Sequence, residues 1–191
     1  DFEITFPVAE AFNAEGAGTA VSPYLIKTVE QFTALATNVN GGTDYNGTHF
    51  ALAADLDFSS VQSVAYQPVG DIDTPFNGTF DGAGHTVKGL NVSNYSYATL
   101  GLFGRLGVNA TVKNINIEGF RLSSAGTYVA ALAAFCEGKV DNITVTSTSI
   151  TGNCDMAAGI VAGARGCTIT NATFQGSLTG NGSVAAIASQ A

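Results

Sequence analysis

The stretch ATVKNINI (110–117) recurs along the chain and decides the fold. Its ungapped counterparts are HTVKGLNV (85–92), GKVDNITV (138–145) and CTITNATF (167–174), whose fifth positions lie 25 to 29 residues apart. A second element keeps a similar spacing and appears as GLFG (101–104), ALAA (131–134), GIVA (159–162) and AIAS (186–189). Two elements that repeat in phase indicate a solenoid, in which each unit of about 25–30 residues forms one coil and stacks on the next.

Each copy loses its period of two at the same position. Val112 and Ile115 are three residues apart, whereas Ile115 and Ile117 are two apart. A strand that changes parity at the same point in every repeat turns a corner there. The sequence therefore predicts a mainly β protein, a parallel β-helix with bends at residues 113–114, 141–142 and 170–171. Small residues at inward positions, among them Ala131, Ala133, Gly159 and Ala162, predict a narrow interior without a ligand cavity.

The region before the repeats predicts a cap. Thr28 and Gln31 fit a capping box, and apolar residues at helical spacing follow, so we expect one helix over residues 28–38. A strand over residues 50–58 comes next. An unprotected solenoid end invites pairing with another chain, and a helix packed over it prevents this. We divide the chain into a helix-containing cap at 22–80 and parallel β-solenoid coils at 81–191.

The first 21 residues are treated separately. Residues 1–8 alternate apolar and polar positions, with Phe2, Ile4 and Phe6 on one face, and a flexible stretch at 14–20 follows. This N-terminal strand either is donated to a neighbouring subunit or forms an ordinary first strand of the cap.

Composition excludes several classes of protein. The 191 residues include 7 Lys+Arg and 15 Asp+Glu, for a net charge of −8, so a nucleic-acid partner lacks its electrostatic driving force. With 46% hydrophobic and 12% charged residues, the chain does not fit an acidic disordered protein. No apolar run is long enough to predict a membrane span.

The chain resembles the GLUG-repeat family, found among bacterial cell-surface adhesins and beside surface peptidases. The resemblance is carried by the helix followed by FALAADLDFS (50–59), YQPVG (66–70), FNGTFDGAGHTVKGLNV (76–92) and GLFG (101–104), and it covers about residues 22–189. The later copies, ALAA and GIVA, depart from the pattern, and the density of glycosylation motifs exceeds that of the bacterial members. The resemblance implies a right-handed parallel β-solenoid at the cell surface, usually without catalysis of its own.

Eight of the 14 asparagines stand in N-x-[ST] motifs, more than the Ser and Thr content explains by chance. Either several carry N-glycans, or the tripeptides serve as turns in a repetitive β protein. Both interpretations favour an extracellular, secreted or cell-surface location. The glycosylation candidates are Asn46, Asn77, Asn91, Asn94, Asn109, Asn142, Asn171 and Asn181.

The corner asparagines present a further choice. Asn114, Asn142 and Asn171 could stack inward as an amide ladder, or point outward, where the last two could carry glycans. A buried ladder asparagine cannot carry a glycan, so these two interpretations exclude each other.

Two acidic pairs, Asp55 with Asp57 and Asp71 with Asp73, are the only candidates for hydrolysis or for a metal. Hydrolysis of a glycosidic bond needs two carboxylates that face each other across a groove, but both pairs precede the coils and neither recurs in them. The same pairs could hold calcium with nearby carbonyls, or they are solvated acids at strand edges. His49 and His85 lack a nucleophile at a suitable spacing. We therefore expect no catalytic residue, no resident metal and no cofactor.

The three cysteines are Cys136, Cys154 and Cys167. Cys136 and Cys167 fall at nearly equivalent places in adjacent coils, which makes them the candidate disulfide, the alternative being two separate buried thiols. Cys154, at the other end of its coil, would be a free or interchain thiol.

These features predict a non-catalytic extracellular structural protein, a β-solenoid subunit or stalk module of a surface filament. Its partners would be further copies in a head-to-tail homopolymer, or further repeats of the same chain. The alternative is an adhesin or glycan-binding module of a longer cell-surface protein, in which Tyr95, Tyr97 and Tyr128 provide stacking platforms for surface glycans.

Overall fold

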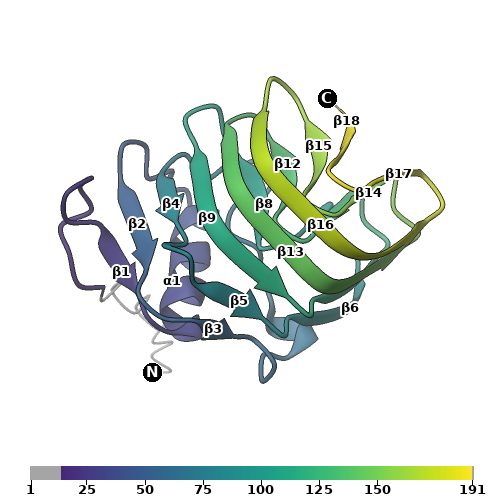
Figure 1. Ribbon diagram of the computed structural model, residues 1–191, viewed down its shortest axis with the longest axis horizontal. Coiled ribbons are helices and arrows are strands. Elements are labelled where there is room, and N and C mark those ends of the chain that lie inside the picture. The colour runs from purple at the N-terminus through teal and green to yellow at the C-terminus, as the bar shows by residue number, and fades with distance from the viewer. Residues whose placement is uncertain (1–13, 191) are drawn as a thin grey trace, which may run out of the picture.

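The computed structural model describes residues 14–190, apart from the side chains of Val64 and Gln190. The predicted N-terminal strand at residues 1–8 lies outside the described residues. The described chain is a right-handed parallel β-solenoid with one α-helix, as predicted. In Figure 1 the coils advance from the N-terminal end at the left to the C-terminal end at the right.

One long face of the solenoid contains a strand from every coil. These strands pair only in parallel, in the order β1 (Tyr24–Ile26), β2 (His49–Leu52), β4 (Thr79–Asp81), β9 (Thr111–Glu118), β13 (Lys139–Gly152) and β16 (Thr168–Gly180). Inward apolar residues align across the face from Phe50 through Phe80, Val112 and Val140 to Ile169. This alignment makes one continuous core.

Two smaller sheets complete the last four coils. The rear sheet contains β8 (Phe103–Leu106), β12 (Ala133–Cys136), β15 (Val161–Ala164) and β18 (Ala188–Gln190), and the side sheet contains β7 (Thr99–Leu100), β11 (Tyr128–Ala130), β14 (Met156–Ala158) and β17 (Ser183–Ala185). In the rear sheet Ala133 pairs with Phe103 and Val161, and Val161 pairs with Ala188. The predicted GLFG-type repeat is therefore confirmed in its register.

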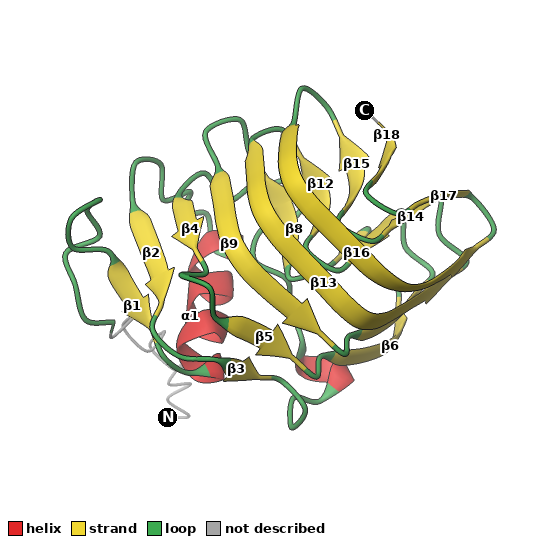
Figure 2. Cartoon of the chain, in the orientation of Figure 1, coloured by secondary structure: helices red, strands yellow, loops and turns green. Residues whose placement is uncertain are grey.

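Short strands fill the remaining positions. β3 (Leu56–Asp57) pairs with β5 (Thr86–Lys88), which pairs with the C-terminal part of β9. β6 (Asn91–Tyr95) pairs with β10 (Arg121–Ser124), which pairs with the C-terminal part of β13. A single 3₁₀ turn, Ser63–Ala65, precedes the first rear strand. Figure 2 shows that strands make up most of the molecule, with a long connection between β3 and β4.

The first of the four aligned repeats was placed wrongly. Val87 pairs with Ile117, and the partner of Val112 is Phe80. The first corner is longer than the later ones, because Gly82, Ala83 and Gly84 separate β4 from β5, and Ala83 and Gly84 adopt φ of 50° and 81°. An ungapped alignment cannot accommodate this longer corner. The three later copies are in the predicted register.

The predicted bends are present. Asn114, Asn142 and Asn171 have φ of 56°, 54° and 50°, the left-handed conformation that Asn tolerates better than most residues. A second bend, which the sequence analysis missed, follows at Gly89, Gly119 and Ser147, with φ of 75°, 67° and 53°. Between the two bends each long strand crosses from one face of the coil to the next.

Helix α1 (Val29–Asn40) closes the N-terminal end. Its N-cap is Thr28, whose Oγ1 accepts a hydrogen bond from the amide of Gln31 at 3.3 Å, as the predicted capping box requires. The helix lies behind β2 and β4 in Figure 2. Its Phe32 makes edge-on contacts with Phe58, Phe80 and Phe103, with ring centroids 5.7–6.2 Å apart. The helix therefore shares its core with the coils.

The interior narrows as predicted. Ala131, Ala133 and Ala162 are fully buried, and a Cβ on Gly159 would lie 2.2 Å from the carbonyl oxygen of Ala186. The predicted boundary between cap and coils, at residue 80, falls within β4, which pairs with strands on both sides.

Candidate functional site

The first acidic pair binds its own neighbours. Asp55 Oδ1 lies 3.0 Å from His85 Nδ1 and accepts the amide of Thr86 at 2.9 Å. Asp57 accepts the amide of Ser59 at 3.0 Å and forms a 3.4 Å ion pair with Lys88. Hydrogen bonds from Thr86 and His85 lower the pKa of Asp55, and those from Ser59 lower the pKa of Asp57. Both carboxylates thus stay ionised and join adjacent coils.

The second acidic pair forms a turn. Asp71 Oδ1 accepts hydrogen bonds from the amides of Asp73 and Thr74 and from Thr74 Oγ1, at 2.8–2.9 Å. Partial burial raises the pKa of Asp71, but these hydrogen bonds outweigh it and leave the pKa below its ordinary value. Among residues 14–190, no three His, Cys, Asp or Glu side chains gather as a metal site.

The corner asparagines form a ladder on the outside of the solenoid. Asn142 Nδ2 donates to Asn114 Oδ1 at 2.9 Å, and Asn114 Nδ2 donates to Asp81 Oδ1 at 2.9 Å. In the next coil Asn171 Nδ2 donates to Asp141 Oδ1 at 2.8 Å. Asn142 and Asn171 are exposed. The assumption that a ladder must be buried was wrong, because a side chain at a left-handed corner can reach along the outer surface to the next coil.

Seven of the eight glycosylation candidates are exposed: Asn46, Asn91, Asn94, Asn109, Asn142, Asn171 and Asn181. Asn77 is half-buried, and its Oδ1 lies 2.2 Å from the position of a Cβ on Gly107. Glycosylation of these asparagines stays a prediction, and Asn77 has the least room for it.

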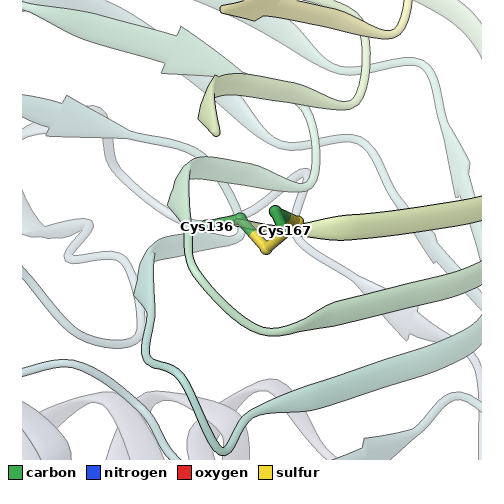
Figure 3. Close-up of a disulfide and its surroundings, with 2 residues drawn as sticks. All are labelled: Cys136 and Cys167. Atoms are coloured by element: carbon green, nitrogen blue, oxygen red, sulfur yellow. A yellow bond between two sulfur atoms is a disulfide. The ribbon is translucent and has the colours of Figure 1, made fainter. Parts of the chain in front are cut away.

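Cys136 and Cys167 form a disulfide between adjacent coils, with their Cα atoms 5.6 Å apart (Figure 3). It joins the end of β12 to the loop before β16. Cys154 is free and buried, and burial raises the pKa of its thiol. A buried thiol cannot reach another chain, so the interchain alternative for Cys154 does not fit this structure.

A charged row next to the disulfide was not predicted. Glu137, whose side chain is only 8% exposed, pairs with Arg105 at 2.7 Å and with Arg165. Hydrogen bonds from Arg105 and Arg165 hold the pKa of Glu137 below its ordinary value, against the opposing effect of burial. The three residues come from three coils, about 30 positions apart, so their contact becomes visible only once the coil register is known.

A cavity of about 490 Å³ lies between the loop 67–72 and the segment 95–99, against the end of helix α1. We call it the tyrosine pocket, and its lining includes Asn40, Gln67, Asp71, Ile72, Tyr95 and Tyr97. The rings of Tyr95 and Tyr97 are 5.3 Å apart and tilted by 56°. Tyr128 lies elsewhere and packs edge-on against Phe135 at 5.4 Å. The structure therefore brings together two of the three predicted stacking tyrosines with one predicted acid.

Comparison with known proteins gives two relatives. The chain is 30% identical over 156 residues to halomucin of Haloquadratum walsbyi, covering 76% of this chain and 2% of halomucin. It is 30% identical over 139 residues to a proposed Gly-rich membrane protein of Evansella cellulosilytica, covering 69% of this chain and 15% of that protein. The chain thus spans a small part of both relatives. No protein-family model matches, so the resemblance to GLUG-repeat proteins stays a prediction.

A solved structure shares the fold. A proposed immunoglobulin A1 protease from Bacteroides ovatus superposes with a TM-score of 0.52 and 17% identity, covering 91% of this chain and 73% of that one. An identity this low supports the fold alone. In residues 14–190, no helix has both the length and the apolar character to cross a membrane.

Proposed function

We propose that this chain is a non-catalytic β-solenoid module of an extracellular, cell-surface protein, and that it extends a stalk or filament by stacking against further coils. The further coils come from a continuing chain or from a second copy joined head to tail. In both cases the same surface, the open edge of β16, meets the next coil.

The state of the last coil carries this proposal. Val140, Val145 and Ile150 in β13 are buried, but their register partners Ile169, Phe174 and Leu178 in β16 are only half-buried. β16 pairs with β13 on one side and with no strand on the other among residues 14–190. An apolar parallel edge of this kind is a template for another strand in the same register.

The relatives support the cell-surface part of the proposal. One is named halomucin and the other a Gly-rich membrane protein, and both are far longer than this chain. A repeating module in a long surface protein gains reach with each coil, because every added strand lengthens the stack by about 4.8 Å. The seven exposed glycosylation motifs fit the same location, because N-glycans are carried at the surface of extracellular proteins.

The carboxylate contacts support a role without catalysis. Asp55, Asp57 and Asp71 each accept a hydrogen bond from a backbone amide. Asp55 and Asp57 also contact His85 and Lys88 of the next coil, and Asp71 accepts the hydroxyl of Thr74. These contacts hold turns and adjacent coils in place.

Sedimentation velocity of the recombinant chain, made without N-glycans, tests the stacking. We expect association that increases with protein concentration and that Leu178→Lys abolishes. In the free chain the lysine can extend its ammonium group past the half-buried position into water, but a further coil would bury the charge. Thr179→Lys is the matched control, since Thr179 is the adjacent, exposed position and should leave association unchanged.

Circular dichroism confirms that each variant is folded. A chain that stays monomeric at every concentration would contradict the head-to-tail joining of copies, and two lysine variants with the same behaviour would contradict stacking at the edge of β16.

A further inference from the structure

The tyrosine pocket has the size and shape of a small-molecule site. Its volume of about 490 Å³ lies within the range of about 300–1,000 Å³ that such sites occupy. The solenoid interior is tightly packed, so this cavity lies outside it, where the loop before β4 and the loop before β7 meet.

The walls of the pocket are held in place before any ligand binds. Asn40, at the end of α1, accepts the amide of Gly70 at 2.9 Å and donates to the carbonyl of Pro68 at 3.1 Å. Arg105 donates to the carbonyl of Ile72. Gly70 has φ of 78°, and a Cβ there would lie 2.8 Å from the carbonyl oxygen of Arg105. A fixed wall loses little conformational entropy when a ligand binds.

The pocket offers an aromatic face to solvent. Tyr97 is 73% exposed and Ile72 is 45% exposed, and they are two of the few large apolar side chains exposed in residues 14–190. The ring of Tyr95, which is half-buried, packs against the ring of Tyr97. An exposed aromatic ring beside a cavity offers a flat surface on which the apolar face of a ligand can pack.

The polar groups point to a neutral ligand rich in hydroxyls. None of the residues that line the cavity is basic, and the chain carries a net charge of −8, so anions are disfavoured. The single carboxylate, Asp71, has Oδ1 occupied by three donors, while no described residue donates to Oδ2. The free oxygen of Asp71, Oδ2, is therefore suited to accept a hydrogen bond from a ligand hydroxyl, and the exposed side-chain amide of Gln67 nearby is suited to bind another.

We propose that the tyrosine pocket binds a neutral saccharide, with the C–H face of one sugar ring on Tyr97 and its hydroxyls on Asp71 and Gln67. A sugar ring has both the apolar face and the hydroxyl groups that this lining requires. This activity goes beyond the structural role, and it would make the module a stalk element that also contacts carbohydrate.

The test uses the 191-residue chain made without N-glycans, because Asn94 next to Tyr95 is a glycosylation candidate whose own glycan could occupy the pocket. Maltose, cellobiose and N,N′-diacetylchitobiose are titrated in turn, and the backbone amide signals of Gly70, Ala98 and Thr99 are followed by NMR. At least one disaccharide should shift these signals in a saturable manner.

Variants then locate the site. Tyr97→Ala should weaken binding by about fivefold or more, while Tyr97→Phe, which keeps the ring, should stay within about twofold of the wild type. Val108→Ala, at a position 69% exposed and outside the pocket, is the matched surface control and should leave binding unchanged. Asp71→Asn keeps the three hydrogen bonds to Oδ1 and replaces the free acceptor, so it should weaken binding severalfold.

Tetramethylammonium tests whether the pocket binds a cation instead of a saccharide. Two tyrosines and a carboxylate could also hold a cation. The proposal is overturned if no disaccharide gives a saturable shift, if Tyr97→Ala binds as well as the wild type, or if tetramethylammonium binds more tightly than every disaccharide. Leu178→Lys should leave saccharide binding intact, so the pocket and the stacking edge are tested separately.

Discussion

The corner ladder gives the sharpest prediction of stability. Asn142 combines a left-handed backbone, φ 54°, with a 2.9 Å hydrogen bond from its Nδ2 to Asn114 Oδ1. Alanine at this position lacks the hydrogen bond and adopts the left-handed conformation less readily than asparagine. The left-handed conformation costs a residue with a Cβ about 1 kcal/mol or more, and the exposed hydrogen bond contributes about 0.5–1 kcal/mol. We therefore expect Asn142→Ala to lower the free energy of unfolding by about 2 kcal/mol.

Glycine separates the two contributions. Asn142→Gly loses the hydrogen bond but adopts positive φ without strain, so its cost should be about 1 kcal/mol, part of it from the more flexible unfolded chain. Asn116→Ala is the matched control: Asn116 lies in β9 and donates a 2.8 Å hydrogen bond to the carbonyl of Gly84, but without positive φ. Its cost should be about 0.5–1 kcal/mol.

The assay is urea unfolding of protein made without N-glycans, followed by far-UV circular dichroism. Equal losses for Asn142→Ala and Asn142→Gly would refute the backbone contribution. A loss for Asn142→Ala no larger than that for Asn116→Ala would refute the account of the corner as a whole.

Three further predictions concern the core, the charged row and the disulfide. Phe103→Ala removes a fully buried ring that touches Phe32, Phe76 and Phe80, and should cost about 3–5 kcal/mol in urea unfolding, whereas exposed Val108→Ala should cost almost nothing. The pKa of Glu137 is lowered in the fold, so its contribution to stability is present above its ordinary pKa of 4.5 and is lost as pH falls through the lower, folded value. Thermal melts between pH 7 and pH 3 should therefore fall more steeply for the wild type than for Glu137→Gln, and parallel curves would contradict the ion-pair assignment. Cys136→Ser should lower stability by about 3–4 kcal/mol for a cross-link spanning 31 residues; alkylation of the unfolded wild type should modify one cysteine, and modification of all three would show that the disulfide is absent.

The periodic part of the fold could be predicted from the sequence because each coil needs apolar residues at the same inward positions. Val112, Val140 and Ile169 each fill the same inward position, so their spacing carried the register of the long face. The helix was predicted because its cap and its apolar stripe are local signals, contained within a dozen residues. The later corners were visible as a change of parity.

The errors arose where a coil departs from its neighbours. Gly82-Ala83-Gly84 lengthens the corner between β4 and β5. The ungapped comparison therefore aligned Val87 with Val112, whereas its partner is Ile117. The second bend could not be seen in the spacing of apolar residues. Gly119 and Ser147 turn the backbone through positive φ, but they do not change that spacing in the same way in every coil.

The candidate site was only partly predictable. Tyr95 and Tyr97 were singled out for their chemistry, and Asp71 for its charge, but nothing in the sequence joins them to Asn40 and Gln67, which lie up to 57 residues away. Only the stacking of coils brings these segments to one cavity. The same reason explains why the row of Arg105, Glu137 and Arg165 was missed.

Cryo-electron microscopy of the 191-residue chain at increasing concentration shows whether copies stack end to end. We expect rods one solenoid wide that lengthen with concentration, with a repeat of about 4.8 Å along the long axis within each copy. Leu178→Lys should give short, single particles under the same conditions. Single particles of the wild type at all concentrations, or rods that grow by contacts between their sides, would contradict the stacking of copies at the open edge of β16.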